Sequence, residues 1–194
     1  MSRWKSSMPA SYFEGLYAGK VDPWDFESSG YERMKYDATL AALRRARYRR
    51  GLEIGCSIGV LTARLATRCD SLLSIDVAEK ALQAARERCR AFANVEFDKV
   101  RVPTKWPAGR FDLIILSEVV YYLDAGDVSR LAEQVRASTE PGGDVLLVHW
   151  TGPTNYPLSG DEAAELFTTA LGRSAHRTRR QRTQAYRLDA FAVQ

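Results

Sequence analysis

The sequence is poor in the residues that most often bind metals, with two histidines and three cysteines among 194 residues. Cys56, Cys69 and Cys89 are odd in number, and none of them lies in a C-x-x-C spacing. We therefore expect no metal site and no disulfide framework. Free cysteines in a chain of this size favour a reducing, cytoplasmic compartment.

Long apolar runs are also missing. The opening stretch, MSRWKSSMPASYFEG, lacks the apolar core of a signal peptide, and no later run is long enough to span a bilayer. The net charge is only +4, and the arginine-rich residues 172–183 have no aromatic residues between them that could stack on bases. We expect neither a membrane nor a nucleic acid as a partner.

From about residue 50 the chain alternates strand-like apolar runs with amphipathic helical patterns. The strand-like runs lie near residues 50–55, 71–76, 94–97, 110–118, 144–150, 175–182 and 185–193. This alternation predicts one α/β domain with a mostly parallel, doubly wound sheet of seven strands, helices on both faces and a C-terminal antiparallel hairpin. Residues 49–194 would form this core, and residues 1–48 a helical segment that acts as a lid. PGG (141–143) is expected to be a turn, and Asp161 an N-cap.

The stretch GLEIGCSIGV (51–60) ends the first predicted strand and holds a carboxylate, Glu53, and two glycines, Gly55 and Gly59. In a doubly wound sheet, ligands bind beyond the carboxyl ends of the strands, where the strand order reverses. The glycines let the backbone turn tightly and approach a ligand, whereas Glu53 would repel a diphosphate. The stretch therefore predicts a ligand with a cationic group and no phosphate.

Asp76 ends the second strand, where a carboxylate can accept both hydroxyls of a ribose; its alternative role is a helix N-cap. Residues 53–59 (EIGCSIG) resemble the E/D-x-G-x-G-x-G motif of class I S-adenosylmethionine-dependent methyltransferases, with Ser57 in place of the middle glycine. The resemblance implies a Rossmann-like methyltransferase fold that binds S-adenosyl-L-methionine and its product, S-adenosyl-L-homocysteine. The cofactor-binding residues expected from it are Glu53, Gly55, Cys56, Ser57, Gly59, Asp76, Val77, Arg101, Val102, Ser117 and Trp24, with adenine read by backbone groups near Arg101 and Val102.

Two further segments, residues 12–36 (YFEGLYAGKVDPWDFESSGYERMKY) and 111–124 (FDLIILSEVVYYLD), resemble the nodulation (NodS-type) branch of these enzymes. That branch N-methylates the amino sugar at the end of a chitooligosaccharide. Residues 149–162 (HWTGPTNYPLSGDE) depart from it and are similar to uncharacterised relatives of the branch. The resemblance implies a small-molecule methyl acceptor, expected to be an amine, and a monomer or homodimer.

Glu118 and His149 end the fourth and fifth predicted strands and are the candidate catalytic residues. Glu118 could hold a cationic amine or accept its proton, and His149 could act as general base; a helix cap and a hydrogen-bonded wall residue are the respective alternatives. We expect Trp24 to cover the cofactor. Arg33 or Lys35 could receive the methionine carboxylate, although a solvated helix face is the favoured position for both.

The sequence leaves three rival functions open. The nearest is O-methylation of a small-molecule hydroxyl, for which His149 would be needed as the base. The others are a nicotinamide-dependent oxidoreductase, which Glu53 disfavours, and a non-catalytic binding protein on the same fold.

Overall fold

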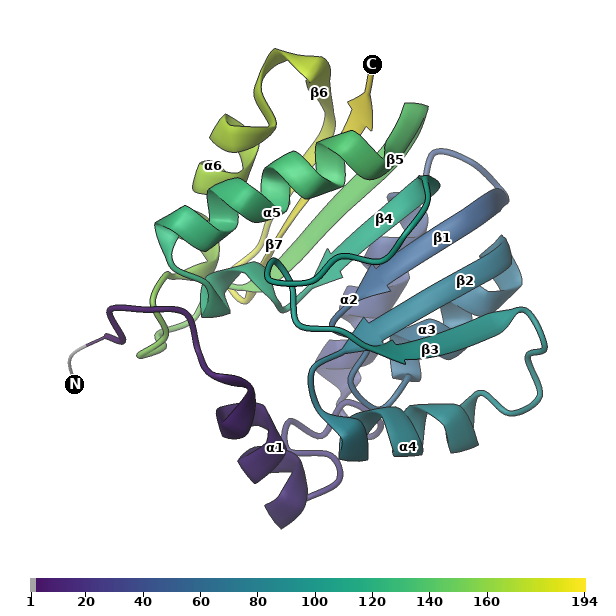
Figure 1. The fold of residues 1–194 in the computed structure, drawn as a ribbon, viewed down its shortest axis with the longest axis vertical. Helices are drawn as coiled ribbons and strands as arrows, with labels where there is room; N and C mark the ends of the chain where they lie inside the picture. Colours follow the sequence, from purple (N-terminus) through teal and green to yellow (C-terminus); the bar gives the residue numbers. More distant parts are fainter. Residues whose placement is uncertain (1–2) are drawn as a thin grey trace.

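The computed structural model describes residues 3–194 and is built around one sheet with the strand order β3-β2-β1-β4-β5-β7-β6 (Figure 1). The strands are β1 (Tyr48–Ile54), β2 (Cys69–Asp76), β3 (Val95–Lys99), β4 (Phe111–Ser117), β5 (Thr139–Trp150), β6 (Ala175–Arg182) and β7 (Tyr186–Val193). The first five pair in parallel, and β7 runs antiparallel to both of its neighbours. The predicted seven-stranded α/β sheet with a C-terminal antiparallel hairpin is confirmed.

Helices cover both faces of the sheet (Figure 1). They are α1 (Ala10–Gly19), α2 (Gly30–Ala41), α3 (Val60–Leu65), α4 (Glu79–Arg88), α5 (Ala125–Ser138) and α6 (Gly160–Leu171), with short 3-10 turns including η2 (Val120–Tyr122). The apolar sides of α5 and α6 pack in one core cluster, and α2 and α3 contribute to a second cluster with other strand residues. Every residue of β4 is buried, as expected for a central strand covered on both faces. Among residues 3–194, no helix is both long and apolar enough to cross a bilayer.

The position of β1 explains where a ligand can bind. The chain runs from β1 to β2 and β3 on one side of the sheet and then returns to β4 on the other side of β1. The connections that follow β1 and β4 therefore diverge, and a crevice opens at the carboxyl ends of these two strands.

Two local predictions need correction. The N-cap of α6 is Ser159, not Asp161, because the Ser159 hydroxyl accepts the Glu162 N–H and the Glu162 carboxylate accepts the Ser159 N–H in return. PGG (141–143) lies inside β5 as an irregularity: Phe111 is opposite Thr139, whereas Leu113 is already opposite Asp144.

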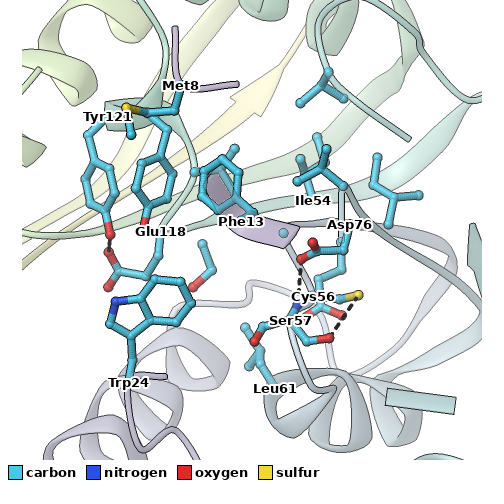
Figure 2. Close-up of a pocket in the computed structure, with 18 of the residues that line it drawn as sticks. Met8, Phe13, Trp24, Ile54, Cys56, Ser57, Leu61, Asp76, Glu118 and Tyr121 are labelled. Carbon is cyan, nitrogen blue, oxygen red and sulfur yellow. Dashed lines mark hydrogen bonds between the residues drawn. The ribbon is translucent and has the colours of Figure 1, made fainter. Parts of the chain in front are cut away.

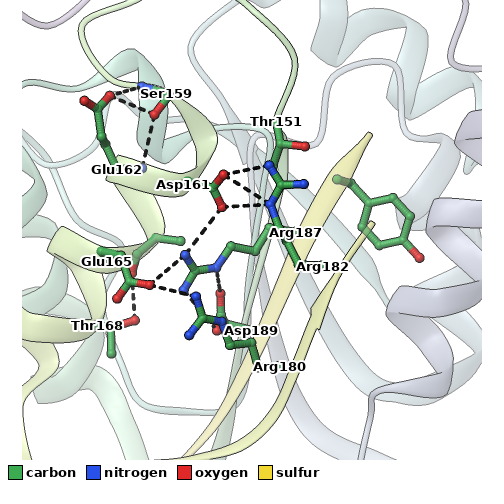
Figure 3. A network of polar contacts seen from close by, with 12 residues as sticks. Thr151, Ser159, Asp161, Glu162, Glu165, Thr168, Arg180, Arg182, Arg187 and Asp189 are labelled. Carbon is green, nitrogen blue, oxygen red and sulfur yellow. Dashed lines mark hydrogen bonds and ion pairs between the residues drawn. The ribbon is translucent and has the colours of Figure 1, made fainter. Parts of the chain in front are cut away.

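The C-terminal hairpin is joined to α6 by charged side chains (Figure 3). Arg187 on β7 is buried, and its Nε donates to Asp189 at 2.5 Å. Its Nη1 lies 2.8 Å from Glu165 and 3.5 Å from Asp161, both on α6. Arg182 on β6 also pairs with Asp161, at 2.8 Å. Part of the arginine-rich stretch 172–183 is therefore used within the protein, on the edge strand of the sheet.

The segment before α1 crosses to a distant part of the chain. The Met8 N–H donates to the Tyr122 carbonyl at 2.8 Å. The Ser7 N–H donates to the Asp124 carboxylate at 3.2 Å, and the Asp124 N–H donates back to the Ser7 hydroxyl at 2.9 Å. These contacts hold α1 across the carboxyl ends of the strands.

Candidate active site

A cavity of about 440 Å³ lies at the carboxyl ends of the strands, at the predicted crevice. Its walls come from the N-terminal segment, α2, the β1–α3 turn and the ends of β2 and β4. Figure 2 shows two polar groups on opposite sides of it, Asp76 on one side and Glu118 on the other, with Phe13 between them. The cavity therefore has two polar ends with aromatic and aliphatic side chains between them.

The β1–α3 turn forms the floor near Asp76. Gly55 has φ +81°, and a Cβ there would lie 2.2 Å from the Val119 Cγ2 atom. Ser57, which replaces the middle glycine of the motif, also has a positive φ, at +50°. Its N–H donates to Asp76 at 2.9 Å, and its hydroxyl accepts from the Tyr17 hydroxyl at 2.5 Å. Ser57 thus keeps a left-handed conformation because both its backbone and its side chain are held.

Asp76 is fixed by backbone groups. Its two oxygens accept the N–H groups of Ser57 and Ala78, each at 2.9 Å. The N-cap of α4 is Ala78, so Asp76 does not have the alternative capping role. Burial raises the pKa of Asp76 and the backbone hydrogen bonds oppose the rise. Each carboxylate oxygen has a second lone pair, which a ligand hydroxyl can use.

Glu53 is buried beneath this turn. Its Oε2 accepts the Thr62 hydroxyl at 2.6 Å and the Ser74 hydroxyl at 2.8 Å. Burial raises the pKa of Glu53, and the hydrogen bonds from the two hydroxyls offset only part of this rise. The net change is from 4.5 to about 7. A cationic ligand group nearby would favour the charged form, so Glu53 is suited to an ammonium.

Glu118 at the other end has a crowded set of partners. Its φ is +58°, which turns the side chain away from the course of β4. One oxygen pairs with the Lys35 ammonium. The other accepts the Tyr121 hydroxyl at 2.7 Å and the Trp150 N–H at 2.8 Å. Burial is the largest influence and would raise the pKa of Glu118, but Lys35, His149 and the Trp150 N–H together outweigh it, so the pKa is lowered. Glu118 is therefore a stable carboxylate and a weak base.

His149 does not have the position that a general base needs. It is fully buried, and it is not among the residues within 3–194 that line the cavity. Its Nε2 accepts the Val120 N–H at 3.1 Å, and its Nδ1 has no hydrogen-bond partner within the described chain. Burial lowers its pKa from 6.5 to about 4. This position disfavours His149 as general base, because η2 covers the imidazole and the Val120 N–H occupies its lone pair.

Lys35 also differs from expectation. It is 1% exposed, whereas a solvated helix face was favoured for it and for Arg33. Arg33 is exposed as expected. The Lys35 ammonium bridges Glu32 and Glu118 at the cavity wall. Sequence reasoning also missed Glu32 itself, which is 6% exposed and lines the cavity.

The structure brings most of the predicted cofactor residues together. Those that line the cavity are Trp24, Glu53, Gly55, Cys56, Ser57, Asp76, Val77, Arg101, Val102 and Ser117. Gly59 is not in this set among residues 3–194; a Cβ there would lie 3.0 Å from the Ala85 Cα, so this glycine lets α3 and α4 approach each other. In the part of the chain that the structure describes, no cluster of three or more His, Cys, Asp or Glu is placed to hold a metal ion.

Comparison with known sequences identifies relatives. The family model of nodulation protein S (NodS) matches residues 17–139. The chain is 30% identical over 127 residues to nodulation protein S of Rhizobium tropici, covering 64% of this chain and 53% of that protein. It is 31% identical over 127 residues to the Sinorhizobium fredii protein, covering 64% and 59%. The chain thus spans about half the length of the curated relatives it matches.

Solved structures agree on the fold. A provisionally assigned methyltransferase of Pseudomonas syringae is 39% identical, with a TM-score of 0.74 over 84% of this chain and 99% of that one. The Bradyrhizobium japonicum N-methyltransferase NodS, in complex with S-adenosyl-L-homocysteine, has a TM-score of 0.80 at 23% identity, covering 95% and 97%. The likeness confirms the predicted Rossmann-like methyltransferase fold.

Proposed function

The chain belongs to the nodulation protein S (NodS) family, and from this premise we propose that it transfers a methyl group from S-adenosylmethionine to an amine nitrogen of a small molecule. The family match confirms the resemblance drawn from the sequence. The observation that carries the proposal is the cavity at the strand ends, with Asp76 and Glu118 at its two polar ends (Figure 2).

The Asp76 end fits the cofactor. S-adenosylmethionine has a ribose, an ammonium and a sulfonium, and when bound it supplies an electrophilic methyl group. Asp76 has free lone pairs for the ribose hydroxyls. Glu53 offers a carboxylate that has hydroxyl partners but no cationic partner among residues 3–194, and it is suited to the ammonium. Trp24 lines the wall and would cover the cofactor, and the backbone near Arg101 and Val102 would take the adenine.

The Glu118 end fits an amine acceptor better than a hydroxyl. In the part of the chain that the structure describes, two carboxylates, Glu32 and Glu118, share one cation, Lys35, so this end in its ionised form has a net negative charge that attracts an ammonium. Methylation of a hydroxyl would need a stronger base, and His149 is too deeply buried to serve. The NodS relative of known structure is an N-methyltransferase. An amino sugar or a related metabolite is the acceptor class we propose.

Two measurements, made one after the other, test the proposal. Calorimetry should show that S-adenosyl-L-homocysteine binds with a micromolar Kd, which corresponds to a binding free energy on the order of 8 kcal/mol. The protein is then incubated with S-adenosylmethionine that has a deuterated methyl group and with one candidate acceptor at a time. The acceptors are glucosamine, de-N-acetylated chitooligosaccharides and simple primary amines, and the control for each is an alcohol with the same carbon skeleton. Mass spectrometry should detect the label on an amine and not on its matched alcohol.

Two results would refute the proposal. One is NADH binding without S-adenosyl-L-homocysteine binding, which would favour an oxidoreductase. The other is label on the matched alcohols alone, which would assign an O-methyltransferase.

A further inference from the structure

Two helices of this chain begin with the same four-residue pattern, Ser-Gly-x-Glu, but use the glutamate differently. At α6, Glu162 folds back and accepts the Ser159 N–H at 2.7 Å, which completes a capping box. At α2, Ser29 accepts the Glu32 N–H at 3.3 Å, but the Glu32 side chain does not return to Ser29. Glu32 is directed inward instead, so its carboxylate is free for another use.

The Glu32 carboxylate is only half satisfied. Its Oε1 accepts from Lys35 at 2.9 Å. Its Oε2 is buried and meets no donor with full hydrogen-bond geometry within residues 3–194, although the Tyr36 hydroxyl lies near the carboxylate and Glu32 lines the cavity. Buried polar atoms are nearly always hydrogen-bonded, so an unpartnered carboxylate oxygen on a residue that lines a cavity indicates a missing donor.

The neighbouring charges show what kind of donor is missing. Glu118 is satisfied by three partners: Lys35, Tyr121 and the Trp150 backbone. Lys35 is shared between the two carboxylates, so when both are ionised one negative charge has no counter-ion within residues 3–194. That charge belongs to the carboxylate with the open oxygen, Glu32. A single cation with N–H donors would complete the cluster.

We propose that Glu32 Oε2 binds the ammonium of the methyl acceptor and then takes one proton from it. This inference rests on the proposed N-methyltransferase function and deepens it. The N–H bond breaks, an O–H bond forms on Glu32, and the nitrogen keeps the electron pair that methylation then uses. The proton leaves Glu32 for water once the product amine has gone. Glu32, and not Glu118 or His149, is the proton acceptor of the reaction.

The environment of Glu32 suits this role. Burial raises its pKa, and Glu118 adds to the rise; Lys35 and the nearby Tyr36 hydroxyl oppose it without cancelling it. Tyr31 on the same helix stays neutral, because burial raises its own pKa. A carboxylate with a raised pKa is a better proton acceptor than an ordinary surface glutamate.

The first test uses benzylammonium as the cation and benzyl alcohol as its neutral match, each titrated by NMR into protein saturated with S-adenosyl-L-homocysteine. We expect benzylammonium to bind at least about tenfold more tightly than benzyl alcohol. Glu32→Gln should remove most of this preference, while Glu162→Gln, the matched variant at the other helix start, should keep it. The amide introduced by Glu32→Gln retains an oxygen for Lys35, and unchanged binding of S-adenosyl-L-homocysteine shows that the variant is folded.

The second test needs no variant. The NMR chemical shift of the Glu32 carboxyl carbon, assigned through the backbone, is measured as a function of pH. The protein is again saturated with S-adenosyl-L-homocysteine, and the titration is run with and without benzylammonium. The cation should lower the apparent pKa of Glu32 by about one pH unit or more and leave the Glu118 signal unchanged, because Glu118 is already ionised.

Three outcomes would overturn the inference. They are equal affinity for benzylammonium and benzyl alcohol, an apparent pKa of Glu32 that does not change when benzylammonium is added, and weaker binding of S-adenosyl-L-homocysteine to Glu32→Gln. The last would place Glu32 at the cofactor. A wild-type protein that fails to bind S-adenosyl-L-homocysteine would instead refute the proposed function, so the two failures are distinguishable.

Discussion

Replacing Glu53 with glutamine should stabilise the folded protein increasingly as the pH rises. The carboxylate is fully buried and its pKa is raised from 4.5 to about 7. Below about pH 4.5 it is protonated in both states; between about pH 4.5 and 7 only the unfolded chain loses the proton. The free energy of unfolding therefore falls as pH rises through this window, because the folded state binds more protons.

The size of the effect follows from the same values. At about 1.4 kcal/mol for each pH unit, a rise in pKa from 4.5 to about 7 makes the ionised folded state about 3 kcal/mol less stable. Glutamine cannot ionise, and its amide oxygen can still accept the hydroxyls of Thr62 and Ser74. Any fixed cost of the amide cancels when two pH values are compared. The stability of Glu53→Gln relative to the natural protein should rise by about 2–3 kcal/mol between about pH 5 and 8.

Urea unfolding followed by tryptophan fluorescence, without cofactor, measures this difference at several pH values. Glu87→Gln, on the exposed face of α4, is the matched variant and should show no such trend. A difference between Glu53→Gln and the natural protein that stays constant from about pH 5 to 8 would refute the reasoning. The same carboxylate should release a proton when S-adenosyl-L-homocysteine binds near neutral pH, which calorimetry in buffers of different ionisation heat detects.

The other predictions concern the two ends of the cavity and its cover. Asp76→Ala should weaken S-adenosyl-L-homocysteine binding at least about tenfold by calorimetry, since a hydrogen bond to a charged group contributes roughly 1.5–3 kcal/mol; an unchanged Kd would remove Asp76 from the ribose site. Trypsin should cut residues 10–30 readily without cofactor and slowly with it, because this segment covers the cavity. Mass spectrometry measures the cleavage, and equal rates in both states would contradict a lid. Tyr17→Phe, which loses the hydrogen bond to Ser57, should be cut faster than the natural protein in both states. His149→Asn should keep turnover within about threefold across pH 6–9, whereas a loss of about 10²-fold would restore it as general base.

The sequence was most informative about the parts of the site that are formed by residues close to one another in the chain. The strand periodicity, the glycine turn and the acid at the end of β2 are all set within short segments. Parallel pairing then brings their carboxyl ends to one edge of the sheet. Asp76 and Gly55 could therefore be assigned to the cavity from residue order alone, and the structure places both there.

The acceptor end could not be predicted in the same way. Ser29 and Glu32 form a pattern that usually closes on itself at a helix start, so nothing local indicates that Glu32 turns inward. The burial of Lys35 depends on how α2 packs against the sheet. His149 ends β5 as expected, but η2 folds over it, and that cover comes from another part of the chain.

The long-range contacts of the N-terminal segment also set an order for folding during synthesis. Ser7 and its partner Asp124 are 117 positions apart in the chain. Ribosomes release residues in order, so Ser7 and Met8 leave the exit tunnel long before β4 and η2 exist to receive them. Loop closure over such a separation is slow compared with local pairing. The central strands can thus assemble with their carboxyl edge still open to solvent, and Ser7 and Met8 cross that edge only afterwards.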